Sequence, residues 1–197
     1  MTRIIICACI CAAVWLLNLK NIISGLKRGP VSEFYTHLGL SLFFSLLCLE
    51  LLLGLNGAWK NSGILLLKIT GFVLYAPAAY LTVSSLKALK TKGKPEDEHS
   101  SGLSFYGITG TSKIVDSGIY GIVRQPMTLG MSIWSLALIA VFQTIPSLII
   151  GAVSIVIFYL AAKSEIKPNI EKFGEPYKEY MKNVPMWNFL QGLRKKK

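Results

Sequence analysis

The stretch that decides the fold is residues 126–162, PMTLGMSIWSLALIAVFQTIPSLIIGAVSIVIFYLAA. It contains two apolar runs, Met127–Phe142 and Ile145–Ala162, which are separated only by a Gln-Thr pair. A single helix over both runs would be about 36 residues long and would pass through Pro146, whereas a bilayer is crossed by about 20 residues. The stretch therefore predicts two membrane-spanning helices joined as a tight helical hairpin.

Three further apolar runs precede this hairpin, at Ile4–Leu19, Leu38–Leu55 and Ile64–Leu86. The chain has 197 residues, of which 52% are hydrophobic and only 16% are charged. A soluble domain carries about 25% charged residues, so this composition excludes both a soluble globular protein and a disordered one. We predict an all-α polytopic membrane protein that forms a single membrane domain over residues 1–197, with about five transmembrane helices.

The positive charges orient this predicted topology. The chain has a formal net charge of +11, and 18 of its 21 Lys and Arg residues fall in the segments on one side of the five spans, against two on the other side. Cytoplasmic loops carry the excess of Lys and Arg, so the C-terminus is predicted in the cytoplasm and the N-terminus outside. The basic residues are interpreted as orientation signals and lipid-headgroup contacts, and no nucleic-acid partner is expected.

Two charged residues, Glu50 and Lys68, lie within predicted spans. Intramembrane charges are costly and are candidates for function. Both residues are placed in the outer half of the membrane, and we expect them to form an ion pair. The alternatives are a snorkelling lysine with a separate contact for the glutamate, or a role in binding substrate.

The four cysteines, at positions 7, 9, 11 and 48, all lie in apolar stretches. A spacing of two on a helix spreads side chains around the helix and does not match a zinc pattern. They are interpreted as small apolar membrane residues, and no metal site is predicted. Of the two histidines, His99 is predicted to be a solvated loop residue and His37 an interfacial one.

Ser117–Gly130, SGIYGIVRQPMTLG, is the most informative polar stretch. Pro126 suits the first turn of a helix, where its missing N–H costs nothing. Arg124 then lies just before a helix N-terminus at the membrane surface, an arrangement that suits an anionic group. The same pattern is also typical of a positive-inside arginine followed by a helix-start proline.

Glu165 follows the last predicted span, 41 positions after Arg124. A helical hairpin brings the two cytoplasmic ends together, so these residues are expected to be neighbours. Glu165 could neutralise Arg124, hold the amino or ribose group of a ligand, or mark the end of the helix. The segment Lys163–Lys197 is predicted to form a cytoplasmic C-terminal helix that packs on the membrane domain. Its apolar stripe consists of Phe173, Tyr177, Tyr180, Met181 and Val184.

These motifs together carry a family resemblance. The pattern S-G-I-Y-x-x-x-R-x-P-M-x-x-G, the hairpin, Glu165, and F-G-x-x-Y-x-x-Y at residues 173–180 resemble the isoprenylcysteine carboxyl methyltransferase and phospholipid methyltransferase superfamily. The resemblance covers roughly residues 113–187 and marks residues 113–197 as a methyltransferase-like cofactor-binding region, after a three-span part with its cytoplasmic loop at residues 1–112. It implies an integral membrane enzyme that uses S-adenosylmethionine on a lipophilic or lipid-linked substrate reached from the bilayer, with the active site in the cytoplasm.

The resemblance also implies the site residues. Arg124 and Glu165 are the expected catalytic residues. The expected cofactor-binding residues are Tyr120, Arg124, Gln125, Pro126, Gly130 and Glu165.

Three positions depart from the family pattern, because Gln125 replaces a histidine, Thr128 a tyrosine and Ile166 the second residue of a Glu-Glu pair. Glutamine donates and accepts hydrogen bonds much as neutral histidine does, so cofactor geometry is expected to be kept. Loss of the histidine favours a carboxyl, thiol or similar acceptor over an amine, which must first lose a proton. The two alternatives are a relative that binds a ligand or lipid without efficient methyl transfer, and a non-enzymatic membrane subunit.

Overall fold

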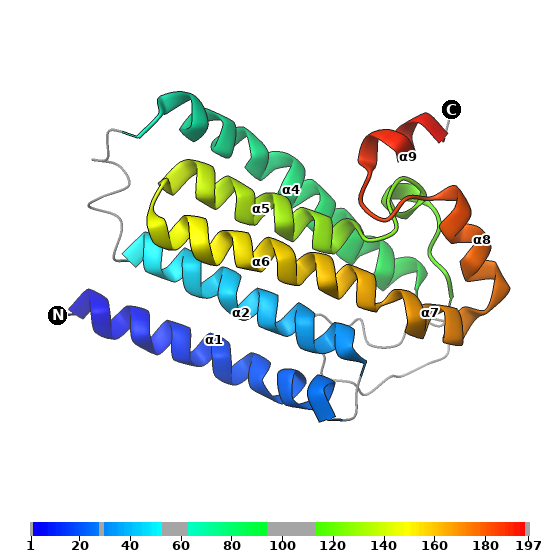
Figure 1. The fold of residues 1–197 in the computed structure, drawn as a ribbon, viewed down its shortest axis with the longest axis horizontal. Helices are drawn as coiled ribbons and strands as arrows, with labels where there is room; N and C mark the ends of the chain where they lie inside the picture. The colour runs from blue at the N-terminus through cyan, green and yellow to red at the C-terminus, as the bar shows by residue number, and fades with distance from the viewer. Residues whose placement is uncertain (1, 28–29, 53–62, 94–112, 196–197) are drawn as a thin grey trace.

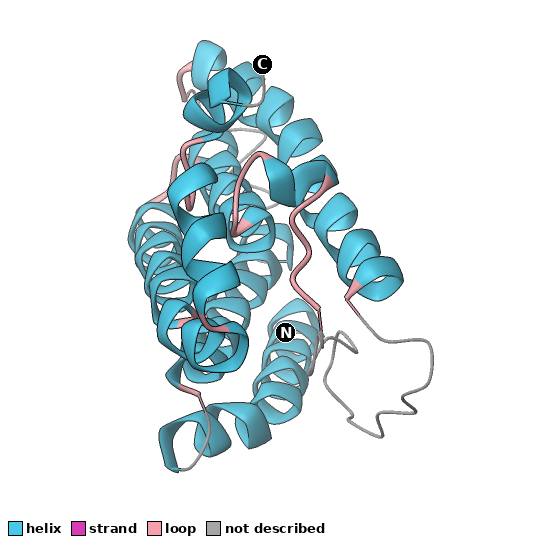
Figure 2. Cartoon of the chain, turned by 90° about the vertical axis from the view of Figure 1, so that its right-hand side faces the viewer, coloured by secondary structure: helices cyan, strands magenta, loops and turns pink. Residues whose placement is uncertain are grey.

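The structure, a computed structural model, describes residues 2–27, 30–52, 63–93 and 113–195. These residues form helices and loops, without a strand among them (Figure 2). The helices are α1 (Thr2–Lys27), α2 (Val31–Leu52), α4 (Leu65–Lys92), the 3-10 turn η1 (Gly118–Gly121), α5 (Pro126–Phe142), α6 (Ile145–Ser164), α7 (Ile166–Phe173), α8 (Glu175–Asn183) and α9 (Phe189–Lys195).

The five long helices lie side by side in the spatial order α1, α2, α6, α5, α4 (Figure 1). Glycines allow the central helices to approach closely: a side chain at Gly39 of α2 would meet Phe158 of α6, and one at Gly71 of α4 would meet Val141 of α5. Small residues at helix interfaces are typical of membrane bundles, where backbones pack closely. The hairpin α5–α6 therefore forms the middle of the molecule, and its neighbours flank it.

The predicted spans all coincide with helices. Four stretches are long and apolar enough to cross a membrane: α1, α2, α4 and the continuous stretch Ile145–Phe173. The apolar helix α5 is shorter, with 17 residues, which is the lower limit of the length that crosses a bilayer. The all-helical membrane fold is thus confirmed, while the count of five spans and their orientation remain predictions.

The tight hairpin between α5 and α6 is formed as predicted. Gln143 ends α5 in the left-handed conformation, with a φ of 52°, and its side chain exchanges hydrogen bonds with the backbone N–H and C=O of Ile64. Thr144 caps α6, because its hydroxyl accepts from the Ser147 backbone N–H at 3.1 Å. Two residues thus reverse the chain and satisfy the helix ends.

The predicted ion pair between Glu50 and Lys68 is not formed. Glu50 is buried and accepts a hydrogen bond from the Thr144 hydroxyl. The ion pairs among the described residues do not include one between Glu50 and Lys68. The reason is the helix order, since α6 and α5 lie between α2 and α4.

The C-terminal region forms three short helices instead of the single predicted helix. The chain continues from α6 into α7 at Glu165 and then breaks at Gly174, whose φ of 63° and ψ of −139° are essentially restricted to glycine. The predicted apolar stripe does pack inward, because Tyr177 and Val184 are buried. The cytoplasmic location of the C-terminal region remains a prediction. The predicted loop residue His99 lies outside the described residues.

Candidate active site

A cavity of about 320 Å³ lies at one end of the helices, where α1 and α4 end and α2 and α5 begin. Figure 2 looks onto this end, and the short helices α7–α9 gather there. Four of the predicted site residues line the cavity: Tyr120, Arg124, Gln125 and Glu165. Residues that are 45 positions apart in sequence thus share one wall, as the hairpin argument predicted.

The wall is built by pairing residues 118–125 with residues 180–187. Gly118 starts η1 with a φ of 66°, which favours glycine at this position of the motif. The backbone N–H groups of Arg124 and Gln125 then donate to the carbonyls of Pro185 (2.9 Å) and Met186 (3.3 Å). The last part of the chain therefore fixes the segment that carries the motif.

Arg124 is half-buried and held from one side. Its Nε donates to the Val184 carbonyl at 2.7 Å, which fixes the plane of the guanidinium group. No carboxylate among the described residues lies within 4 Å of it, so Glu165 lines the same cavity without forming an ion pair with Arg124. The positive charge remains available to an anionic ligand.

Glu165 is bonded to Gln125. The Gln125 Nε2 donates to Glu165 Oε2 at 2.6 Å, and the Gln125 side chain is buried. A short hydrogen bond to a carboxylate is a charge-assisted one. The glutamine at the position of the family histidine therefore orients the acid at the end of α6.

Two buried tyrosines complete this wall. Burial raises the pKa of Tyr120, and the nearby Glu165 and Tyr180 raise it further, against a smaller opposing effect of a hydrogen bond with Ser85. Burial also raises the pKa of Tyr180, whose hydroxyl donates to the Tyr120 carbonyl at 2.6 Å. Both phenols are therefore neutral hydrogen-bond donors at physiological pH.

The aromatic wall continues at Tyr177. Burial raises the pKa of Tyr177, while its hydrogen bond with Asn169 and the positive charge of Arg124 act in the opposite direction. Asn169 Nδ2 donates to the Tyr177 hydroxyl at 3.3 Å. The spacing of the F-G-x-x-Y-x-x-Y pattern thus places Tyr177 beside the guanidinium of Arg124 and Tyr180 beside η1.

Pro126 and Gly130 do not line the cavity in the described part of the chain. Pro126 is fully buried in the first turn of α5. Gly130 faces α4, because a Cβ at this position would lie 2.5 Å from Thr82 Oγ1 and 3.0 Å from the Ala78 carbonyl. Both residues therefore pack within the helical bundle, and their role in cofactor binding remains a prediction.

The first 112 residues also contribute to the cavity, which the motif did not predict. His37 lines it from α2, and His37 Nδ1 lies 2.6 Å from Asn18 Oδ1 of α1. Asn18 Nδ2 donates to the Val14 carbonyl, so the amide oxygen faces the ring and accepts from Nδ1–H. The neutral ring then has Nε2 as its acceptor. A polar residue inside the first apolar run, Asn18, was the signal in the sequence.

A second, smaller cavity of about 20 Å³ adjoins the first. Both are lined by Thr36 and Met127, and the smaller one is otherwise lined mainly by apolar side chains of α2, α5 and α6, among them Leu40, Met131 and Phe158. The polar cavity therefore borders a small apolar space between the helices.

The fold and this cavity are those of an all-helical membrane protein with a polar cavity at one end of its helices. A family model of phospholipid methyltransferases matches residues 66–175. The chain belongs to this family of membrane methyltransferases, within the superfamily that the motif indicated. No curated protein and no solved structure gives a significant match. The matched region runs from α4 to the start of α8 and ends before Tyr177 and Tyr180.

Proposed function

We propose that the protein is an S-adenosylmethionine-dependent methyltransferase that acts on a lipophilic or lipid-linked acceptor in the 320 Å³ cavity. The observation that carries the proposal is the convergence of Arg124, the Gln125–Glu165 pair and Tyr120 on one cavity. These residues lie inside the region that matches the methyltransferase family.

The donor set fits the methionine part of the cofactor. Arg124, which has no carboxylate partner among the described residues, and the separate carboxylate of Glu165 match the two charges of a zwitterionic amino acid. Arg124 would hold the carboxylate of the cofactor, and Glu165 would accept from its amino group or a ribose hydroxyl. Gln125 has a second amide N–H and its carbonyl oxygen for a further contact. When bound, the cofactor supplies an electrophilic methyl group.

The chain's own residues exclude water and orient the acceptor. Tyr120 and Gln125 are buried, so one wall of the cavity is shielded from solvent. The acceptor's hydrophobic part would lie towards the apolar side chains next to Thr36 and Met127, with its reactive atom towards Arg124 and Glu165. Placing two reactants in this way contributes much of the rate enhancement in group transfer.

His37 extends the range of acceptors. A neutral ring held by Asn18 presents Nε2 as a proton acceptor, and this is the function that Gln125 lacks. Carboxyl and thiol acceptors need little help from a base. With His37 in the cavity wall, a lipid amine also becomes an acceptor, since its ammonium form can pass a proton to the ring.

The test is calorimetry of the detergent-purified protein with S-adenosylmethionine and S-adenosylhomocysteine. Arg124→Ala and Glu165→Ala should each weaken binding by about 1.5–3 kcal/mol, the usual effect of losing a charge-assisted hydrogen bond. The matched controls are Arg194→Ala and Glu171→Ala, which remove the same charges from exposed positions outside the cavity. Equal losses in the controls would show that net charge alone governs binding.

Gln125→His tests the altered motif. Histidine can still donate to Glu165, so cofactor binding and methyl transfer should be kept or increased. His37→Asn should lower the transfer rate and leave cofactor affinity within about twofold, because the role proposed for His37 is towards the acceptor and not the cofactor. If wild type and Gln125→His both fail to bind the cofactor while folded, the proposal is wrong. Binding without transfer to any lipid extract would identify a ligand-binding relative.

A further inference from the structure

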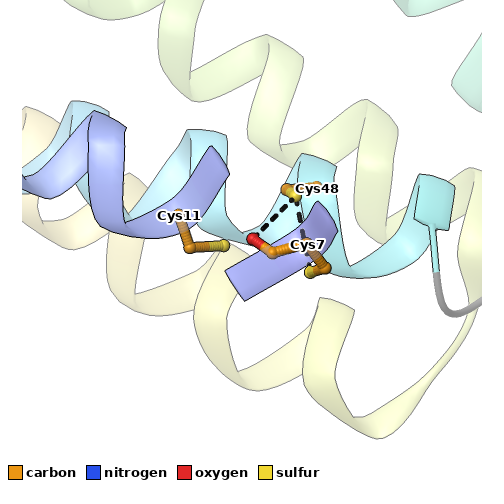
Figure 3. Close-up of side chains that lie close together, drawn as sticks. All are labelled: Cys7, Cys11 and Cys48. Atoms are coloured by element: carbon orange, nitrogen blue, oxygen red, sulfur yellow. Dashed lines mark hydrogen bonds between the residues drawn. The ribbon is translucent and has the colours of Figure 1, made fainter. Parts of the chain in front are cut away.

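Three cysteine thiols meet at the end of the helices opposite the cavity. Cys7 and Cys11 project from α1 towards Cys48 of α2, and the three sulfur atoms all lie within 4.8 Å of one another (Figure 3). Cys7 and Cys48 are buried, Cys11 is half-buried, and all are free thiols. Residues four apart share a helix face, so the predicted spreading of the side chains holds only for Cys9, which is exposed.

The sulfur geometry is that of a metal site with three ligands. Cys48 Sγ lies 3.4 Å from Cys7 Sγ and 3.6 Å from the Cys7 carbonyl, to which it also donates. An ion about 2.3 Å from each of three sulfur atoms in a plane requires sulfur separations of about 4.0 Å. The Cys7–Cys48 separation of 3.4 Å is below this value, and the other two separations are no longer than 4.8 Å. Small rotations of the cysteine side chains would bring the three sulfur separations to the value that a bound ion requires.

The ligand set selects the class of ion. Thiolates are soft ligands that prefer Cu(I), zinc and iron–sulfur clusters. Structural zinc takes four ligands, whereas the group found among the described residues offers three, all of them sulfur. The surroundings are apolar helix faces, where net charge is costly, and a monovalent ion is neutralised by a single thiolate while the other two sulfur atoms stay thiols.

We propose that Cys7, Cys11 and Cys48 form a three-sulfur site for a soft monovalent cation of the Cu(I) type. Binding releases one thiol proton to the solvent for every thiolate formed, so affinity rises with pH. The site also has a structural effect. α1 packs mainly on α2, and a shared ion would connect these two helices at the end away from the cavity. It is independent of the methyltransferase proposal.

The experiment uses the full chain, reduced and purified in detergent. Cu(I) is supplied from a coloured chelator, bathocuproine disulfonate, and its transfer to the protein is followed by loss of absorbance. Wild type should withdraw one Cu(I) per chain. Cys7→Ser and Cys48→Ser should each lose this binding. Cys9→Ser is the matched control, because it removes an exposed thiol from the same helix, and it should bind like wild type.

Three results would overturn the proposal. The first is a wild type that leaves the chelator saturated with copper, and the second is a Cys9→Ser variant that loses copper binding as completely as Cys7→Ser does. The third is alkylation and mass spectrometry showing a Cys7–Cys48 disulfide, with no copper uptake after its reduction. Circular dichroism and gel filtration of each variant establish that it is folded, and Cys48→Ala provides a second variant if Cys48→Ser is not.

Discussion

Replacing Gln125 by leucine would remove the donor to Glu165 while keeping most of the side-chain volume. The 2.6 Å bond is charge-assisted, and such bonds contribute about 1.5–3 kcal/mol. For a chain of 197 residues, each kcal/mol corresponds to about 2–4 °C in melting temperature. We therefore expect Gln125→Leu to melt roughly 3–12 °C below wild type at neutral pH.

The assay is thermal unfolding in detergent, followed by circular dichroism at several pH values. Burial raises the pKa of Glu165, and the hydrogen bond from Gln125 acts in the opposite direction by favouring the ionised form. The difference should therefore shrink on acidification, because the contribution of Gln125 is lost when the carboxylate takes up a proton. Gln191→Leu, at an exposed position of α9, is the control and should shift the melting temperature by less than about 2 °C.

A double-mutant cycle isolates the pair. If Gln125→Leu and Glu165→Leu act through their mutual bond, the double variant should lose clearly less stability than the sum of the single variants. Additive losses, or a melting temperature of Gln125→Leu equal to that of wild type at neutral pH, would refute the reasoning that Gln125 holds the acid at the end of α6.

Three further predictions concern other parts of the fold. Tyr180→Phe removes the donor to the Tyr120 carbonyl and should lower stability by about 0.5–1.5 kcal/mol, measured by thermal unfolding, with helix content unchanged. Thr144→Val removes the cap of α6 and the donor to buried Glu50, and a loss of about 1–3 kcal/mol is expected in the same assay, whereas Thr144→Ser should behave like wild type. Gln191→Cys, exposed in α9, should react with an impermeant thiol reagent only in inside-out vesicles, and labelling of intact cells would reverse the predicted orientation.

The local features of the fold could be predicted from the sequence. The Gln-Thr pair between two apolar runs is sufficient for a hairpin, because the length of a helix in a bilayer is limited. Arg124, Gln125 and Glu165 lie at the ends of the hairpin helices, so the same argument placed them together. The family match extends further towards the N-terminus than the motif did, since it includes α4.

The contacts that depend on helix order could not be predicted. Glu50 bonds to Thr144 because α2 lies against α6, which a sequence pattern does not specify. The place of His37 in the cavity wall depends on α1 bringing Asn18 to it. The same packing of α1 on α2 brings Cys48 to the other cysteines. Charge and polarity marked these residues as unusual, and only tertiary packing determined their partners.

The pairing of residues 118–125 with residues 180–187 has a consequence for biosynthesis. The chain emerges from the ribosome at about 5–20 residues per second, starting from the N-terminus. Tyr180, Val184 and Pro185, which hold η1 and Arg124 in place, are made after all five long helices. All the long helices are therefore synthesised before the ligand site is complete, and a nascent chain that stalls after α6 would have its membrane helices but no finished pocket.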